Sequence, residues 1–308
     1  MKTEVLCVGQ AVVDCITRGV EEDPFGRGKT RAQSITLSLG GDAVNESFVL
    51  ASLGHRVGLM CAVGDDLAGR FVMNEASRRG LDASGVTMVP GLVTPVANMF
   101  VKLDGSRSSV TSAASMLPGY EPSADFIRGC VSEGARIVSF ASLFRAPLDQ
   151  VHVVCELVRA AHESGAVVCA DTKIPTFRKM DLSELEPVLP MIDYIFPNDT
   201  EAAFLAGMDG GADLTEEELR EMADALLAKG IGHVVIKTGE KGCYAASQGG
   251  HFTVPARKVP VVDTTGAGDN LVAGFMDALL AGRSFRECCE AGIWTAAESV
   301  QHLGATPN

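Results

Sequence analysis

The alternation of hydrophobic and polar stretches along the chain predicts strands and helices that follow one another in turn. Short runs in which nearly every residue is apolar, such as residues 166–170, fit strands of a parallel sheet covered by helices on both faces. The pattern predicts strands over 5–9, 57–63, 136–140, 166–170, 192–196 and 233–237, and helices over 43–53, 67–79, 148–164, 216–229, 271–280 and 285 to about 302. We therefore expect a doubly wound α/β domain with a mostly parallel sheet.

Two separated segments show a different, strand-like alternation. Residues 34–39 alternate as a strand with one buried face, and residues 98–103 and 109–112 read as a hairpin that turns at Asp104-Gly105. Strands of this kind inside an α/β chain suggest a small second sheet laid over the main one. We expect residues 1–308 to form a single domain, with a lid contributed by about 12–39 and 93–114.

Composition and charge narrow the class of protein. Hydrophobic residues make up 46% of the 308 residues and charged residues 21%, which is ordinary for a soluble globular protein. No apolar run approaches the ~18 residues of a membrane span, and the N-terminus goes directly into a strand-like run. A net charge of −13 argues against nucleic acid and anionic membranes as partners. The nine scattered cysteines fit reduced thiols in a cytoplasmic protein.

The most informative stretch is 262–270, which reads Val-Asp-Thr-Thr-Gly-Ala-Gly-Asp-Asn. The valines at 259, 261 and 262 suggest a buried strand before it, and an Ala-rich helix follows. Glycines at such a junction let backbone N–H groups curl around an anion, and the helix N-terminus adds positive potential. Asp269 would stand where it can accept a proton from an attacking hydroxyl. The alternative is an ordinary strand-to-helix turn in which Asp269 caps the helix.

Three further motifs have both a structural and a functional reading. Two glycines, Gly40 and Gly41, open the helix that carries Asn45, which alone fits a plain turn. Residues 198–201 read Asn-Asp-Thr-Glu, a good helix start, and a helix N-terminus is also a sensible place to hold phosphate. Residues 237–242 read Lys-Thr-Gly-Glu-Lys-Gly, which alone fits a strand–turn–strand.

Two nucleotide-binding patterns can be dismissed. Residues 26–30 look like the end of a P-loop, but Asp23 stands where that motif needs a glycine and no apolar strand precedes it. The first strand lacks Gly-x-Gly-x-x-Gly, which removes the main argument for a dinucleotide dehydrogenase.

Taken together, these motifs resemble the ribokinase (PfkB) carbohydrate kinase family. The Asp-Thr-Thr-Gly-Ala-Gly-Asp run resembles its C-terminal signature, although the family usually continues with Thr, Ser or Ala and then Phe, where this chain has Asn270-Leu271. Gly-Gly-x-x-x-Asn, followed by Leu53-Gly54 and by Val-Gly-Asp-Asp at 63–66, resembles the N-terminal signature. The resemblance covers nearly the whole chain. It implies a phosphotransferase that moves the ATP γ-phosphoryl group to an alcohol, usually a primary hydroxyl, on a small sugar-like substrate.

The resemblance also assigns roles to matched positions. Asp269 is the implied catalytic base, beside the anion-binding backbone of Gly266, Ala267 and Gly268. The implied sugar-binding residues are Asp14, Gly41 and Asn45, and the implied nucleotide-binding residues are Asn198, Lys237, Thr238, Gly239, Gly242 and Gly268. Glu201 would organise Mg²⁺ through water. A monovalent cation, K⁺, would be held by Asp263 and Thr265 with Ser299, Gly304 and Asn308, and His302 is a further matched position.

The acceptor and the assembly state remain open at this stage. Gly-Gly-Asp at 40–42 resembles the form of the signature found in 2-keto-3-deoxygluconate kinases. Arg145 falls where ribokinase-like chains carry a sugar-contacting glutamate. With Lys173 after a neighbouring strand, these residues suggest an anionic acceptor such as a sugar acid. A neutral sugar, as in ribokinases and fructokinases, and a nucleoside are the alternatives; the few aromatic residues disfavour the nucleoside. A catalytically inactive sugar sensor is a third possibility. Exposed lid strands favour a homodimer.

Overall fold

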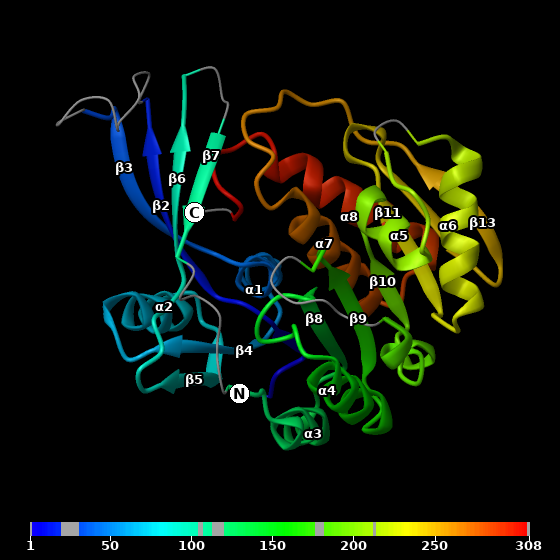
Figure 1. Cartoon of the computed structure of the whole chain (residues 1–308), viewed down its shortest axis with the longest axis horizontal. Helices are drawn as coiled ribbons and strands as arrows, with labels where there is room; N and C mark the ends of the chain where they lie inside the picture. The colour runs from blue at the N-terminus through cyan, green and yellow to red at the C-terminus, as the bar shows by residue number, and fades with distance from the viewer. Residues whose placement is uncertain are drawn as a thin grey trace.

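The computed structural model describes residues 2–19, 31–103, 107–112, 120–175, 182–211 and 214–306. Its strands form two sheets that stand apart in space (Figure 1). The larger sheet contains β1 (Val5–Val8), β4 (Val57–Gly64), β5 (Asp82–Val89), β8 (Ile137–Leu143), β9 (Val167–Thr172), β10 (Tyr194–Phe196), β11 (His233–Lys237), β12 (Cys243–Ser247) and β13 (Gly250–Val254). The smaller sheet contains β2 (Val12–Arg18), β3 (Ser34–Gly40), β6 (Val96–Val101) and β7 (Arg107–Thr111).

The nine-stranded sheet has the order β13-β12-β11-β10-β9-β8-β1-β4-β5. Neighbouring strands from β11 through β5 run parallel, whereas β12 and β13 form an antiparallel hairpin at one edge. Parallel strands need crossover connections, and helices supply most of them. The helices are α1 (Asp42–Ser52), α2 (Leu67–Arg78), α3 (Ala124–Glu133), α4 (Val151–Glu163), α5 (Asp199–Ala206), α6 (Glu216–Ala228), α7 (Ala267–Leu280) and α8 (Phe285–Ser299).

Helices cover the large sheet on both faces, as the continuous apolar strands predict. Buried residues of α3, α4, α5 and α6 pack in one hydrophobic cluster with alternate strand residues such as Leu6 and Val8. Buried residues of α1, α2, α7 and α8 pack in a second cluster with Val5 and Cys7. Successive side chains of one strand thus enter opposite cores, which confirms the predicted doubly wound arrangement.

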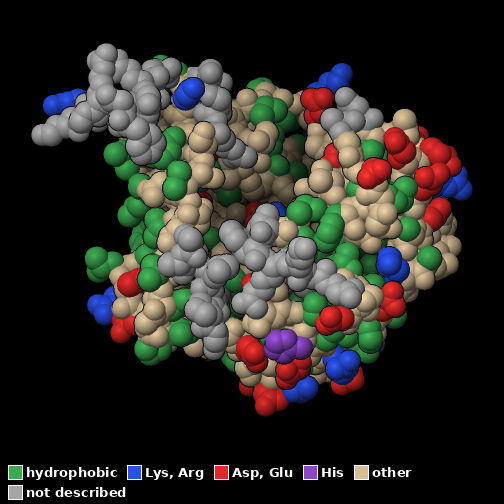
Figure 2. Space-filling view, in the orientation of Figure 1, with side chains coloured by type: hydrophobic (Ala, Val, Ile, Leu, Met, Phe, Trp, Pro, Cys, Tyr) green, Lys and Arg blue, Asp and Glu red, His purple; other side chains and the backbone are tan. Residues whose placement is uncertain are grey.

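The small sheet has the order β3-β2-β6-β7, with β2 and β6 parallel and the outer pairs antiparallel. The predicted hairpin is present as β6 and β7, but its turn at Asp104-Gly105 lies outside the described residues. The same holds for residues 20–30, which include the P-loop-like stretch, and for 113–119. The side of the sheet that carries Ile35, Leu37 and Val110 leaves these residues exposed, and Figure 2 shows hydrophobic side chains there.

One element prediction is wrong. The valines before the glycine turn do not form a buried strand, because the described chain has no strand between β13 and α7, and Val261 and Val262 are 63% and 55% exposed. Pro260 has no N–H for a ladder, and β13 already forms the edge of the sheet. The backbone N–H of Val262 instead donates to the carbonyl of Val300, just after α8.

Within the described residues, no helix combines the length and apolar character that crossing a membrane requires.

Candidate active site

The glycine turn at 266–268 forms the N-terminus of α7. Gly266 caps the helix with a φ of +72°, in the left-handed region that favours glycine, and a side chain there would collide with Ala305. The first N–H groups of a helix have no partner within it and point outward, where the helix dipole favours negative charge. The turn is therefore built to receive an anion.

Asp269 lies in the first turn of α7 and is only 5% exposed. The Nδ2 group of buried Asn45, on α1, donates a hydrogen bond to its Oδ2 at 2.6 Å. Helix α1 also begins at a glycine that needs a positive φ, because Gly41 has a φ of +93° and a side chain would collide with the Gln10 carbonyl. Two glycine-initiated helices thus bring Asn45 and Asp269 together across 224 residues of sequence.

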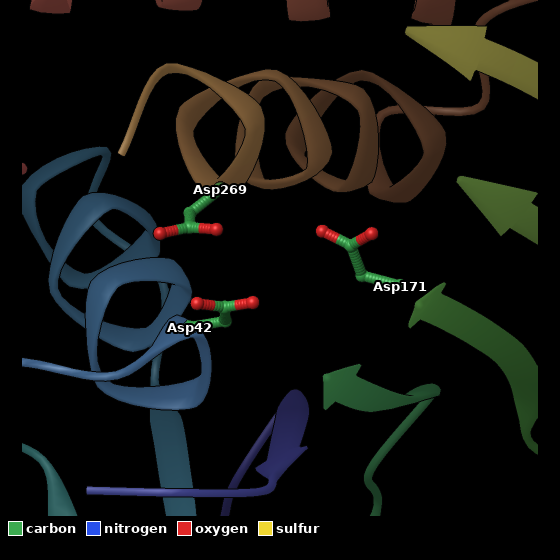
Figure 3. A group of neighbouring side chains, drawn as sticks. All are labelled: Asp42, Asp171 and Asp269. Carbon is green, nitrogen blue, oxygen red and sulfur yellow. The ribbon is translucent and has the colours of Figure 1, made fainter. Parts of the chain in front are cut away.

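Three carboxylates converge at this point. Asp42 at the start of α1, Asp171 near the end of β9 and Asp269 turn toward one another (Figure 3), with one oxygen of each within 4.8 Å of the others. Two lysines balance part of this charge. Lys173 Nζ lies 2.8 Å from Asp42 Oδ2, and Lys237 Nζ donates to both oxygens of Asp171 at 2.6 and 2.8 Å.

The neighbouring charges give two of the carboxyls opposite proton affinities. Burial, and then the negative charge of Asp42, raises the pKa of Asp269 to about 8. Burial acts in the same direction on Asp42, but the charge and hydrogen bond of Lys173, with a hydrogen bond from Ser142, hold the pKa of Asp42 below its ordinary value. Of these two carboxyls, Asp269 therefore has the stronger tendency to take up a proton.

Asp42, Asp269 and Lys173 line a cleft of about 800 Å³ between the small sheet and the N-termini of α1 and α7. Figure 2 shows the molecule hollowed there, with charged side chains at the bottom of the hollow. Asp14 enters the cleft from β2, and burial raises its pKa to about 6. The cleft brings together most of the residues that the sequence singled out, namely Asp14, Gly41, Asp42, Asn45, Lys173, Asn198, Lys237, Thr238, Gly239, Thr265, Gly266, Ala267, Gly268 and Asp269.

A second cavity of about 750 Å³ continues from the first past Lys237 and Gly268. Gly242 lines it, but most of its apolar wall was missed by sequence reasoning. That wall consists of Ala256, Val259, Val261, Leu271, Ile293, Ala296, Ala297 and Val300, with Arg257 and Lys258 beside it. The Arg257 guanidinium stacks on Trp294, 3.5 Å from the ring centroid. The small residues Ala296 and Ala297 on one side of α8 were the sequence signal that could have indicated this cavity.

Residues 198–201 form the start of α5 as a complete capping box. Asn198 Oδ1 accepts from the Glu201 N–H at 2.8 Å, and Glu201 Oε2 accepts from the Asn198 N–H at 2.9 Å. Glu201 also accepts from the Thr172 hydroxyl at 3.1 Å and is 4% exposed. Asn198 lines the cleft, whereas Glu201 stands behind it and supports its wall.

The segments proposed to hold a monovalent cation meet at Asp263. One oxygen of Asp263 accepts from the N–H and hydroxyl of Thr265, and the other accepts from the Gly304 N–H at 3.1 Å. The Ser299 hydroxyl donates within α8 to the Ala296 carbonyl at 2.9 Å, and His302 is exposed. Asn308 lies outside the described residues.

Asn270, which departs from the family pattern, also holds this C-terminal segment in place. Its Nδ2 group donates to the Gly266 carbonyl at 2.8 Å and to the Ala305 carbonyl at 2.7 Å. The side chain is 2% exposed. The loop around Ala305 is thereby fixed against the glycine turn, a role that the sequence did not suggest.

The two residues proposed to bind an anionic acceptor, Arg145 and Lys173, lie in different places relative to the cleft. Arg145 follows β8, is half-buried, and is not among the described residues that line the cleft. Lys173 does line the cleft, but its ammonium group already faces Asp42. The positive charge of Lys173 is therefore largely balanced within the protein.

An α/β enzyme that transfers phosphoryl groups to a small hydroxyl compound is the class that this fold and site define. Comparison with known families gives the specific assignment, since the model of the pfkB family carbohydrate kinases matches residues 2–308. The chain belongs to this family. It is a sugar kinase of the ribokinase type, a phosphotransferase that acts on an alcohol group.

Individual relatives support the family and differ in their substrates. The chain is 29% identical over 273 residues to the ribokinase of Haemophilus influenzae, covering 89% of this chain and 84% of the relative. It is 27% identical over 291 residues to the 2-dehydro-3-deoxygluconokinase of Bacillus subtilis, covering 90% and 85%. The structure of Arabidopsis thaliana ribokinase complexed with ribose and ATP superposes with a TM-score of 0.83 at 24% identity, covering 99% of this chain and 95% of that one. This last likeness confirms the predicted fold.

Proposed function

We propose that this enzyme uses ATP to phosphorylate a primary hydroxyl of a small carbohydrate, with Asp269 as the catalytic base. The observation that carries the proposal is the buried Asp269 carboxylate, held by Asn45 at 2.6 Å in the first turn of a glycine-initiated helix. A new bond forms between the acceptor oxygen and the γ-phosphorus while the bond to the β–γ bridging oxygen breaks. The proton of the acceptor hydroxyl passes to Asp269.

The two cavities suggest how the substrates share the site. We assign the acceptor to the cleft between Asp14, Gly41 and Asn45, whose polar groups can bind sugar hydroxyls. We assign the nucleotide base to the apolar cavity lined by α8, because its walls suit a flat aromatic ring. The triphosphate would then pass the N-terminus of α7 and Lys237. Gly268 and Lys237 line both cavities, and a methyl group placed on Gly268 would stand 3.4 Å from Lys237 Nζ, so the two residues are neighbours in this passage.

Magnesium fits the phosphate side of the cleft. Asn198 and Asp199 line it with oxygen groups, which Mg²⁺ prefers, and Glu201 orients Asn198 from behind. When bound, Mg²⁺ would neutralise charge on the transferred phosphoryl group. Asp263 and Thr265 supply oxygen atoms for a monovalent cation, and their bonds to each other and to Gly304 already shape that loop.

The proposal is tested by measuring ADP release with Mg²⁺·ATP across neutral sugars, sugar acids, sugar phosphates and nucleosides. We expect turnover with at least one carbohydrate, and a loss of turnover in Asp269→Asn by roughly 10²–10⁴-fold. Near-normal turnover in a folded Asp269→Asn protein would overturn the assignment of the base. Turnover restricted to nucleosides would favour the nucleoside kinase alternative.

We also propose a homodimer that forms through the small sheet. Ile35, Leu37 and Val110 are 66%, 60% and 57% exposed on one side of that sheet, an apolar surface that a second copy could cover. Light scattering at micromolar concentration should give twice the chain mass, and Leu37→Lys should shift it toward the monomer. A monomeric mass for the unmodified chain would refute the proposal. The nine free cysteines support a cytoplasmic location.

A further inference from the structure

The acceptor cleft continues beneath the small sheet into a third cavity of about 350 Å³. Asp14, Thr264 and Thr265 line both spaces, so the two are continuous. One wall is the face of β2 and β6 that looks toward the body of the protein. The opposite wall consists of residues 261–265 and 303–305. The proposed function assigns a monovalent cation to Asp263 and Thr265 on this wall but leaves the rest of the extension without a ligand.

Strand geometry determines which side chains of β2 enter the cavity. Asp14, Ile16 and Arg18 are spaced two residues apart, so they share one face of the strand, and all three line the cavity. Arg18 stands four residues beyond Asp14, about 13 Å further along the strand at ~3.3 Å per residue. The cavity therefore has Asp14 near the reacting end and Arg18 toward the far end.

A second cation stands beside Arg18. Arg18 pairs with Val101 across the β2–β6 ladder, and the Gly19 N–H donates to the Val101 carbonyl at 2.9 Å. Lys102 follows directly and also lines the cavity. The parallel pairing of β2 and β6 thus brings two positive charges to one end of the extension.

These two cations differ from the lysines of the reaction centre. Lys173 and Lys237 each have an aspartate partner, whereas in the described part of the chain no ion pair or side-chain hydrogen bond involves Arg18 or Lys102. Among the described residues that line their cavity, the acidic ones are Asp14 and Asp263. Asp263 accepts from Thr265 and Gly304, and Asp14 stands at the other end. In a chain of net charge −13, half-buried Arg18 and exposed Lys102, which pair with no acidic side chain among the described residues, form a local positive end of the cavity.

We propose that Arg18 and Lys102 bind a carboxylate or phosphate group of the acceptor, at the end remote from the hydroxyl that is phosphorylated. This inference rests on the proposed function and specifies its substrate class. A guanidinium offers two parallel N–H groups that match either anion, and the neighbouring ammonium adds charge. A neutral sugar would leave both cations without a partner in the cavity, so the site discriminates against it.

The test compares acceptors that differ in one charged group and keep a free primary hydroxyl. Gluconate and 2-keto-3-deoxygluconate represent carboxylates, fructose 1-phosphate represents phosphates, and fructose is the neutral reference. KM and kcat are measured for the unmodified enzyme and for Arg18→Met, which keeps an unbranched apolar stem. We expect Arg18→Met to raise the ratio of KM for the preferred anion to KM for fructose at least tenfold. Lys102→Met should raise it less, and Arg18→Lys should recover part of the loss.

A matched control removes one positive charge elsewhere. Arg128 on α3 is an exposed arginine outside this cavity, and Arg128→Met should leave the KM ratio unchanged. An unchanged ratio in folded Arg18→Met would overturn the proposal, as would a kcat/KM for fructose that exceeds that of every anion in the unmodified enzyme. The relative loss for carboxylates and for the phosphate identifies which anion the site takes.

A binding measurement separates failure of this inference from failure of the proposed function. The same acceptors, and inorganic phosphate as a competitor, are titrated by calorimetry in the absence of nucleotide. Anion binding that Arg18→Met weakens tenfold supports the site even if none of the acceptors is phosphorylated. Anion binding that Arg18→Met leaves unchanged overturns the site even if the enzyme phosphorylates sugars.

Discussion

Replacing Asp269 by Asn should stabilise the folded protein at alkaline pH while it removes most of the activity. The carboxyl is 5% exposed, and burial together with the charge of Asp42 raises its pKa from an ordinary value of 3.8 to about 8. Asn has nearly the same shape, and its amide oxygen can accept the hydrogen bond from Asn45 that the carboxylate accepts now. The substitution therefore removes an unfavourable buried charge without leaving a cavity.

Proton linkage gives the sign and the size of the change in the free energy of unfolding. Between pH 4 and pH 8 the carboxyl is ionised in the unfolded chain but largely protonated in the folded one, so its contribution to stability falls as pH rises. Each pH unit in this window costs about 1.4 kcal/mol, which sets an upper bound of roughly 6 kcal/mol at pH 8. Because Lys173 and neighbouring dipoles can readjust, we expect Asp269→Asn to raise the free energy of unfolding at pH 8 by about 1–3 kcal/mol. The gain should vanish near pH 4.

The assay is urea unfolding of both proteins at several pH values between 4 and 8, without nucleotide or Mg²⁺. The difference in free energy of unfolding should grow steadily with pH. Asp65→Asn is a suitable control, because Asp65 is an exposed surface carboxylate in an ion pair with Arg70, and its effect should not grow in this way. If Asp269→Asn is less stable at pH 8, or if its effect is independent of pH, the reasoning about Asp269 is refuted.

Three other predictions concern the supports of the site. Glu201→Gln should raise the Mg²⁺ concentration for half-maximal activity by roughly tenfold or more; a loss of stability with an unchanged Mg²⁺ response would show that Glu201 is only a capping residue. Activity should rise when K⁺ replaces tetramethylammonium at equal ionic strength, because Asp263 and Thr265 are proposed to hold the cation, and equal rates would contradict this. Asn270→Ala should lower the free energy of unfolding by about 1–3 kcal/mol and lower kcat more than KM, because the Gly266 and Ala305 carbonyls lose a donor; an unchanged kcat would show that the loop can hold its position without Asn270.

The sequence predicted the architecture and most of the cleft for a physical reason. Parallel strands place their carboxyl ends at one edge, so residues that follow separate strands of the large sheet, such as Lys173 after β9 and Asn198 after β10, had to meet there. It could not predict which charges pair across the cleft. Nothing local to Asp42 or Lys173 indicates their ion pair, which joins positions 131 residues apart (173 − 42). The apolar wall lined by Val261 was misread as a strand, because hydrophobic residues around a ligand cavity and in a sheet core give the same pattern.

The local balance of charge links these findings. An enzyme of net charge −13 that binds ATP must attract an anion to a site whose own centre holds three aspartates. Lys173 and Lys237 each face an aspartate, so in the proposed reaction the phosphates would depend on the N-terminus of α7 and on Mg²⁺ for much of their stabilisation. Burial, and then the negative charge of Asp42, raises the pKa of Asp269, which gives it a high proton affinity and makes it a suitable base. Charges at the far end of the acceptor space, at Arg18 and Lys102, are then free to select the substrate without disturbing the reacting end.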